Sequence, residues 1–281
     1  MESTHIVFVY GTLRKNERNH RLLEGSRLIA EQAWTTGVMY DTGLHYPALQ
    51  KNTKGRVYGE LYEVNNGTLS KLDRLEGYEA QRSDNLYDRV SQSINTDKGT
   101  YEAYVYIMVN NNMLQRKIHG GDWKVYQLEK KPKFYYFAYG SCMDNERFQL
   151  ANVAHHFQKV TGKGTLPGYS LRFTWRSLDG GRADIVEEGG VVEGKVYELA
   201  ADVLPYLYER EGVDASCYRP AVIEVKIDNK MLEVLTFIVV HKKDESAPPA
   251  HYLKEIIRGG NGFLSNEYLM QLKKKFPNVL E

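Results

Sequence analysis

The 281-residue sequence has little cysteine, little proline and almost no net charge. Its two cysteines, Cys142 and Cys217, are too few for a disulfide framework or a cysteine-based zinc site. With 37 Lys and Arg against 36 Asp and Glu, the chain lacks the large basic field that binds phosphate backbones, so nucleic acid is not an expected partner. The 8 prolines beside 21 tyrosines favour a folded sheet with aromatic faces over a disordered chain.

Segments that would direct or anchor the chain are also lacking. No apolar run approaches the roughly 18 residues that a membrane-spanning helix needs, so no membrane association is expected. The first residues, MESTH, are polar and do not form the basic and apolar regions of a signal peptide. Because reduced thiols are typical of the cytosol, we expect a cytoplasmic protein. The histidines show no metal-ligand spacing, so no metal site is predicted.

What the sequence does contain is a repeat. Residues 6–13, IVFVYGTL, and residues 135–142, YYFAYGSC, are apolar runs that stop at Tyr-Gly followed by a small hydroxyl residue, Thr12 or Ser141. A second pair, VYGELYEV at 57–64 and VEGKVYEL at 192–199, alternates like β-strands with one buried face. Self-similarity with a period of about 130 residues is too long for a solenoid and predicts two copies of one domain.

The segment between the two copies has the composition of a linker. Residues 120–134, GGDWKVYQLEKKPKF, combine paired glycines, a charged run and a proline. We therefore predict two domains, residues 1–130 and residues 131–281, each of ordinary size. The second carries an additional tail, from residue 252 to residue 276, that reads as a helix, a glycine-rich turn and a second helix with a serine N-cap.

Two glutamates that follow the repeated strands are candidate acid/base residues. Glu76 and Glu211 each lie twelve residues beyond a strand, and each is followed by glycine. In the simplest interpretation, each is a surface residue in the last turn of a helix that the glycine ends. A carboxylate there faces the negative end of the helix dipole, and this field together with burial would raise its pKa above about 4.3. A raised pKa suits a group that accepts and returns a proton near neutral pH.

The two Tyr-Gly turns are the other candidate feature. Each presents backbone N–H groups and a hydroxyl side chain at the end of a buried strand, before the helix-like stretches NERNHRLL and NERFQL. Such a turn can hold a carboxylate or another anion. An ordinary strand-to-helix connection with a hydroxyl N-cap is the alternative, because a duplicated domain repeats structure as well as function.

Together these segments resemble the γ-glutamylcyclotransferase superfamily. The first half is similar to its γ-glutamylamine cyclotransferase (AIG2-like) branch, through VFVYGTLR, GRVYGELYEV and LDRLEG. The second half is similar to the γ-glutamylcyclotransferase branch proper, through FAYGS, VEGKVYEL, EREGV and the run that ends in NEYLMQL. The resemblance implies an α+β fold, with two tandem small, mostly antiparallel β-barrels and flanking helices.

The chemistry that the resemblance implies uses no metal and no cofactor. A small γ-glutamyl amine or peptide would bind at the turn, and its α-amine would attack its own γ-carbonyl, so that 5-oxoproline forms and the amine or amino acid leaves. Glu76 and Glu211 would be the acid/base residues. The residues implied to line the two pockets are Tyr10, Gly11, Thr12, Leu13 and Tyr106 in the first half, and Tyr139, Gly140, Ser141 and Cys142 in the second.

The second half departs from its branch at two positions. Cys142 stands where the branch usually has asparagine, and Phe237 stands where it usually has tyrosine. Its pocket is therefore either altered in specificity or inactive. Three hypotheses stay open at this point: an enzyme with one or two working sites, a module that binds a small carboxylate without converting it, and an interaction protein that reuses the fold. The glutamate at the same offset in both copies favours the enzyme.

Overall fold

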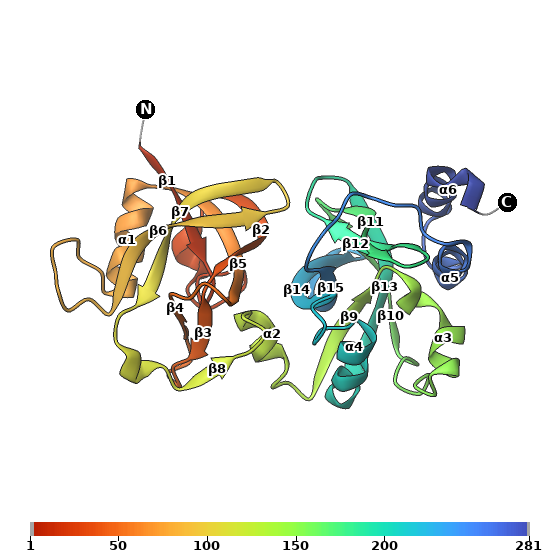
Figure 1. The fold of residues 1–281 in the computed structure, drawn as a ribbon, viewed down its shortest axis with the longest axis horizontal. Helices are drawn as coiled ribbons and strands as arrows, with labels where there is room; N and C mark the ends of the chain where they lie inside the picture. The colour runs from red at the N-terminus through yellow and green to blue at the C-terminus, as the bar shows by residue number, and fades with distance from the viewer. Residues whose placement is uncertain (1–2, 280–281) are drawn as a thin grey trace. The chain divides into compact units, whose positions relative to one another are not determined.

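The computed structural model describes residues 3–279, and the chain forms two compact units, Met1–Tyr126 and Gln127–Glu281 (Figure 1). Each unit is built on a closed barrel of five strands with helices outside it. The predicted α+β fold of two tandem barrels is therefore confirmed. The two units divide inside a short helix, α2 (Trp123–Leu128), close to the predicted domain boundary at residue 130.

The barrel of the first unit has the strand order β1-β5-β2-β6-β7. Strand β1 closes the barrel by pairing in parallel with β7, and all other neighbours are antiparallel. A three-stranded sheet, β4-β3-β8, lies beside it. The elements are β1 (Thr4–Val9), η1 (His20–Leu23), β2 (Arg27–Thr36), β3 (Val38–Asp41), β4 (Pro47–Gln50), β5 (Arg56–Asn65), α1 (Asn66–Glu76), β6 (Tyr87–Thr96), β7 (Gly99–Met108), η2 (Asn111–Met113) and β8 (Arg116–Ile118).

The barrel of the second unit has the strand order β10-β13-β9-β15-β14, again with a single parallel pair, β15 with β9. A hairpin, β11-β12, accompanies it. The elements are β9 (Lys133–Ala138), η3 (Ser141–Met143), α3 (Asn145–Leu150), β10 (Val160–Pro167), β11 (Ser170–Ser177), β12 (Gly180–Val186), β13 (Val191–Ala200), η4 (Ala201–Val203), α4 (Leu204–Arg210), β14 (Tyr218–Ile227), β15 (Lys230–Val239), α5 (Ala250–Gly260), α6 (Asn266–Lys275) and η5 (Pro277–Val279).

The two barrels share one connectivity. Strands β9, β10, β13, β14 and β15 make the same pairings, in the same directions, as β1, β2, β5, β6 and β7. Helices α1 and α4 follow the equivalent strands β5 and β13. The duplication that the sequence predicts is thus present in the topology. The predicted tail is also present, since α5 and α6 follow the second barrel and Ser265 caps α6 by accepting a hydrogen bond from the Tyr268 N–H.

The repeated strand contains glycine because another backbone lies against it. A Cβ at Gly59 in β5 would lie 2.2 Å from the carbonyl oxygen of Val9, at the end of β1. A Cβ at Gly194 in β13 would lie 2.4 Å from the carbonyl oxygen of Ala138, at the end of β9. A glycine inside a strand is often the mark of such a close approach. The glycine therefore allows the last residue of β1 or β9, just before each Tyr-Gly turn, to lie directly against the repeated strand.

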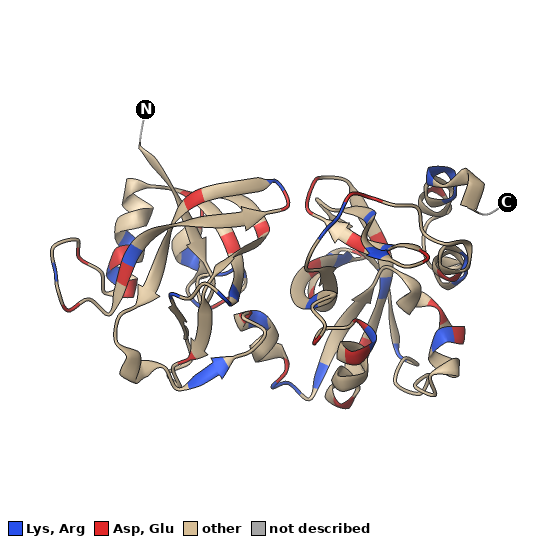
Figure 2. Cartoon of the chain, in the orientation of Figure 1, with Lys and Arg blue, Asp and Glu red and all other residues tan. Residues whose placement is uncertain are grey.

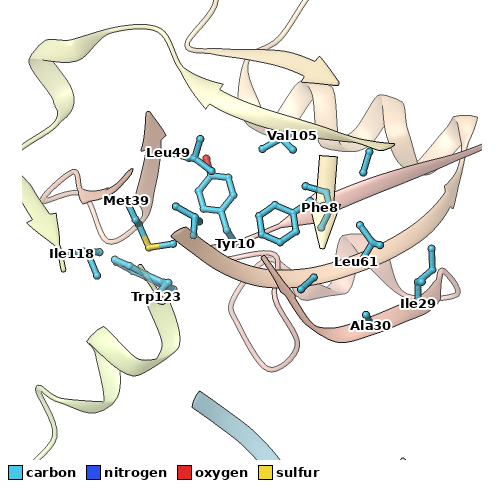
Figure 3. Close-up of a cluster of buried hydrophobic side chains, with 14 residues drawn as sticks. Phe8, Tyr10, Ile29, Ala30, Met39, Leu49, Leu61, Val105, Ile118 and Trp123 are labelled. Atoms are coloured by element: carbon cyan, nitrogen blue, oxygen red, sulfur yellow. The ribbon is translucent and has the colours of Figure 1, made fainter. Parts of the chain in front are cut away.

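Both faces of β1 are buried, which explains its uninterrupted apolar sequence. Phe8 and Tyr10 belong to a core cluster to which all five strands of the first barrel contribute, and Figure 3 shows their rings beside Leu49 and Val105. Val7 and Val9 point the other way, into a second cluster that includes Leu72 of α1. Because successive side chains of a strand point to opposite faces, a strand covered on both sides has no polar face.

The predicted linker, residues 120–134, is not wholly a linker. Asp122 accepts hydrogen bonds from the N–H groups of Lys124 and Val125 and so begins helix α2. Trp123 is 2% exposed and joins the barrel core beside Met39 and Ile118 (Figure 3). The glycine and charge composition gave the wrong prediction here because the ordering comes from tertiary contacts, which composition does not show.

Charges of both signs are interspersed over the elements of each unit (Figure 2). None of the helices within residues 3–279 is long and apolar enough to cross a membrane. The expected cytoplasmic location and the expected absence of nucleic acid partners stay predictions.

Candidate active site

The Tyr-Gly turn of the first unit is held by the tyrosine that precedes it. The Tyr10 hydroxyl donates a hydrogen bond to the carbonyl oxygen of Tyr106, at 2.7 Å, and so ties the end of β1 to β7. Gly11 lies against Pro47, and a Cβ there would be 2.6 Å from the Pro47 Cγ atom. Only glycine fits between these neighbours, so the sequence Tyr-Gly follows from the packing rather than from an unusual backbone conformation.

The turn exposes backbone donors that the protein does not use itself. The Arg14 N–H donates to the Gly11 carbonyl and the Asn19 N–H donates to the Thr12 carbonyl. No acceptor in the part of the chain from residue 3 to residue 279 pairs with the N–H groups of Gly11, Thr12 or Leu13. Because buried N–H groups are nearly always paired, consecutive unpaired ones are suited to bind an anion.

The stretch NERNHRLL after this turn is not an α-helix. Asn16 has a φ of 65°, in the left-handed region, and only His20–Leu23 forms a short 3-10 helix, η1. Asn19 instead folds the segment back, because its Nδ2 donates to the Thr12 Oγ1 at 2.9 Å. The corresponding stretch NERFQL in the second unit does form a helix, α3, so the expectation of a helix is right for only one of the two copies.

Glu76 lies at the end of α1, the helix that packs leucines onto the barrel. The Asn65 side chain caps the start of this helix through the Thr68 N–H, and Gly77, with a φ of 64°, ends it in the left-handed conformation. The Glu76 carboxylate makes no hydrogen bond or ion pair with another residue in the described range. Burial raises its pKa from 4.5 to about 7. The direction is the one predicted from the sequence, and its cause is removal of the carboxylate from water.

These groups surround one cavity of about 190 Å³. Cavities of roughly 150 Å³ already admit a ligand of the size of benzene, so this cavity can hold a small organic molecule. Glu76 and Arg18 are the two charged residues among those that line it. The lining is formed by Phe8, Val9, Tyr10, Gly11, Thr12, Leu13, Arg18, Asn19, Tyr46, Pro47, Leu75, Glu76, Leu86, Tyr87 and Tyr106.

A chain of polar contacts fixes one wall of this cavity. The Tyr106 hydroxyl donates to Asp73 Oδ1 at 2.8 Å, and Arg89 Nη1 contacts the other oxygen of Asp73 at 2.6 Å. Asp73 lies one helical turn before Glu76, so this network anchors the end of α1 against the barrel. The Tyr87 hydroxyl donates to the Pro47 carbonyl at 3.0 Å and holds β4 against the same wall.

The second unit repeats this site with a smaller cavity. The Tyr139 hydroxyl donates to the carbonyl oxygen of Phe237 at 2.5 Å, as Tyr10 does to Tyr106. The cavity beside it measures about 40 Å³, room for a few water molecules. It is lined by Tyr136, Tyr139, Gly140, Ser141, Cys142, Ala183, Glu211, Tyr218, Phe237 and Tyr252.

An arginine occupies the polar end of the second cavity. Arg210 Nη2 donates to Ser141 Oγ at 3.3 Å, and Arg210 Nε lies 2.9 Å from Cys142 Sγ. The Cys142 thiol in turn donates to Glu211 Oε1 at 3.2 Å, and Arg210 Nε lies 4.0 Å from the same oxygen. Burial raises the pKa of the Glu211 carboxyl, while Arg210 and the thiol hydrogen bond oppose that rise. Leu75 stands in the place of Arg210 in the first unit, one residue before the glutamate.

Helix α5, which has no counterpart in the described part of the first unit, fills more of the second cavity. Tyr252 of α5 lines it, and its hydroxyl accepts a hydrogen bond from the Ala183 N–H at 3.2 Å. The polar wall is also different, because Phe237 replaces Tyr106 and packs edge-on against Tyr208, with ring centroids 5.9 Å apart. The two departures seen in the sequence, Cys142 and Phe237, are therefore both in the cavity wall.

The comparison with known proteins gives the same family for both units. A family model described as gamma-glutamyl cyclotransferase, AIG2-like, matches residues 7–125 and, a second time, residues 136–255. The chain belongs to this family. One model thus covers both barrels, including both Tyr-Gly turns and both glutamates.

Relatives of the family are similar over different lengths. "Putative gamma-glutamylcyclotransferase YkqA" of Bacillus subtilis (strain 168) is 43% identical over 281 residues, 98% of each chain. The crystal structure of YkqA has a TM-score of 0.89 to this chain at 41% identity and covers 99% of both. "Gamma-L-glutamyl-butirosin B gamma-glutamyl cyclotransferase" of Niallia circulans is 36% identical over 124 residues, 44% of this chain and 78% of that protein.

The structure brings the predicted residues together in two groups. Glu76 and Tyr106 share the first cavity with the Tyr10–Leu13 turn, and Glu211 shares the second with the Tyr139–Cys142 turn. Their roles stay predictions. Within residues 3–279, no three His, Cys, Asp or Glu side chains group as metal ligands would. Sequence reasoning missed Arg18, Arg210 and Tyr252, although the shared letters Asn-Glu-Arg after both turns were a signal for the first of these.

Proposed function

We propose that the first unit cyclises small γ-glutamyl compounds to 5-oxoproline and releases the amine or amino acid. The observation that carries this proposal is a single cavity in which Glu76, with a pKa of about 7, lies among unpaired turn N–H groups. A group that ionises near neutral pH can accept a proton in one step and return it in the next. The family of the chain supports the same reaction class.

The reaction follows from these groups. The turn N–H groups of Gly11, Thr12 and Leu13 hold the α-carboxylate of the substrate. Glu76, as carboxylate, takes a proton from the α-ammonium, and the freed amine attacks the γ-carbonyl carbon. A C–N bond closes the five-membered ring, Glu76 gives its proton to the former amide nitrogen, and the amide C–N bond breaks. A second proton passes from the ring nitrogen through Glu76 to the departing amine, which leaves as its ammonium form. Since nucleophile and carbonyl belong to one molecule, much of the acceleration comes from holding the chain folded.

We infer that the second unit does not turn over a γ-glutamyl substrate. Arg210 places a positive charge beside Ser141, Cys142 and Glu211, where a substrate ammonium would have to go. The cavity of about 40 Å³ is also too small for a glutamyl group when compared with the first. We therefore infer that the first barrel accounts for the activity of the whole chain.

Single substitutions in the full chain test this assignment. Glu76→Gln keeps the shape of the side chain but removes the acid/base group, so kcat for 5-oxoproline release should fall by about 10²–10⁴-fold. Glu211→Gln should leave kcat within about twofold, because Glu76, to which the proposal assigns proton transfer, is still present. Glu79→Gln, an exposed glutamate that follows the same helix, is the matched control.

Two results would contradict the proposal. Loss of activity in Glu211→Gln with Glu76→Gln still active would move the reaction to the second unit. Unchanged turnover in the double variant would remove both glutamates from the mechanism. Circular dichroism of each variant, together with binding of the unreacted γ-glutamyl compound, separates a chemical effect from a folding defect.

A further inference from the structure

Arg18 is a charged residue of the first cavity to which the proposed reaction assigns no task. It lines the cavity together with Glu76, and its side chain is exposed. Within residues 3–279 its guanidinium forms no ion pair or hydrogen bond. An arginine of this kind presents five N–H donors in a planar fork that matches a carboxylate.

The backbone beside Arg18 is fixed to the turn. Asn19 donates its N–H to the Thr12 carbonyl and its Nδ2 to the Thr12 Oγ1, both at 2.9 Å. Because Arg18 directly precedes Asn19, its Cα is held next to the Tyr-Gly turn while the long side chain stays at the cavity edge. The anchor therefore determines where the free guanidinium can reach.

The second unit shows what the same arginine does when it has a partner. Arg147 lies eight residues after Tyr139, as Arg18 lies eight residues after Tyr10, and both end an Asn-Glu-Arg sequence. Arg147 Nη1 pairs with Glu255 Oε1 of α5 at 2.9 Å. Among residues 3–126 there is no counterpart of α5, so Arg18 is left for a ligand where Arg147 is used to hold a helix.

We propose that Arg18 binds the carboxylate of the leaving group, so that the first unit selects γ-glutamyl amino acids over simple γ-glutamyl amines. This rests on the proposed cyclisation. A γ-glutamyl amino acid carries one ammonium and two carboxylates. Glu76 takes the ammonium and the turn N–H groups take the α-carboxylate, so the second carboxylate needs its own cationic partner. Arg18 is the positive side chain that lines this cavity.

Two substrates that differ only in this carboxylate test the proposal with the full chain. γ-Glutamyl-alanine and γ-glutamyl-ethylamine release alanine and ethylamine, which are alike except for the carboxylate. The wild-type protein should have the higher kcat/KM with γ-glutamyl-alanine. Arg18→Gln should reduce that preference by about tenfold, as expected for a partly exposed charge-assisted hydrogen bond, and should leave γ-glutamyl-ethylamine unchanged. Arg18→Lys should retain part of the preference, because the charge remains but the planar fork is lost.

The control is Arg21→Gln, which removes an exposed arginine three residues away that does not line the cavity. An equal fall with both substrates in Arg18→Gln would place Arg18 on the α-carboxylate and overturn the proposal, as would no change with either. If the wild-type protein converts neither compound, the cyclisation itself is wrong. Calorimetric binding of the two compounds then decides on Arg18 separately: a preference for γ-glutamyl-alanine that Arg18→Gln removes supports it, and equal binding overturns it.

Discussion

Glu76 links the protonation of the site to the stability of the first unit. Its pKa is about 7 in the folded protein, raised by burial from 4.5. Between these two pH values the folded state keeps a proton that the unfolded state has lost, so the free energy of unfolding falls as pH rises. The cost is fully present above pH 7 and absent below pH 4.5. The group to which the proposed reaction assigns proton transfer therefore destabilises the fold above pH 7.

Replacing Glu76 by glutamine should stabilise the protein at alkaline pH. At pH 8 the free energy of unfolding of Glu76→Gln should exceed that of the wild type by up to about 3 kcal/mol, because no buried charge has to form. Below pH 4.5 the two proteins should be equal. Urea unfolding at several pH values measures this difference, with Glu79→Gln as the control. A difference that does not change with pH would show that the carboxyl group is not buried as described.

Which residues line the cavities could be predicted from the sequence only where their place depends on local order. The offsets of Glu76 and Glu211 from their strands were sufficient to select them, and the two lie in equivalent cavities. Arg18 and Arg147 share one local sequence but differ in their partner, which comes from α5 more than a hundred residues further along. No local pattern contains that information.

At the scale of elements, the repeated strand is the part that the sequence describes best. Its alternating pattern predicts β5 and β13, and both pair antiparallel with the strands that precede the turns. The helix after the first turn was wrongly expected because Asn16 adopts the left-handed conformation and Asn19 bonds back to Thr12. A hydrophobic pattern over ten residues is enough to predict a strand. In a short segment, one or two side-chain hydrogen bonds to the backbone or a neighbour can change the conformation, and the pattern does not show them.

Replacing the glycine of each repeated strand by alanine should distinguish the two units by its effect on turnover. Gly59→Ala would place a Cβ against the Val9 carbonyl, and Gly194→Ala would do the same at Ala138. Each should cost about 1–3 kcal/mol of stability by overpacking, visible as a lower melting temperature. Turnover should fall only in Gly59→Ala, because only that change shifts the turn beside Glu76. Equal turnover losses in both variants would contradict a single active unit.

At the scale of the whole molecule, the two units share one barrel but differ in a buried charge. The residue after the strand glycine is negative in the first unit and positive in the second. In the first unit, Glu60 follows the strand glycine and its Oε2 accepts the Lys15 N–H at 2.8 Å. In the second unit, Lys195 has this place and its Nζ donates to the Met143 carbonyl at 3.0 Å. Both side chains hold the backbone that leaves the turn, with opposite charge. The fold therefore tolerates a change of sign at this position, and the two sites could diverge independently.

The segment around Asp122 determines whether the first unit can fold without the second. Arg14 is 1% exposed and pairs with Glu60 at 3.2 Å and with Asp122 at 2.7 Å, while Trp123 completes the core. Removing one partner of a buried ion pair typically costs about 3–5 kcal/mol, and loss of a buried tryptophan about as much again. Together these losses approach the roughly 5–15 kcal/mol that stabilises an ordinary domain.

Two truncations should therefore behave differently. A chain of residues 1–131 keeps the closed barrel, α2 and the whole first cavity, and should fold and retain the kcat/KM of the full protein for γ-glutamyl-alanine. A chain of residues 1–118 lacks Asp122 and Trp123 and should fail to give a cooperative thermal transition by circular dichroism. Folding of the shorter chain would show that residues 119–131 are a linker after all. A folded but inactive longer chain would show that the first site needs the second unit, and would withdraw the assignment of turnover to one barrel.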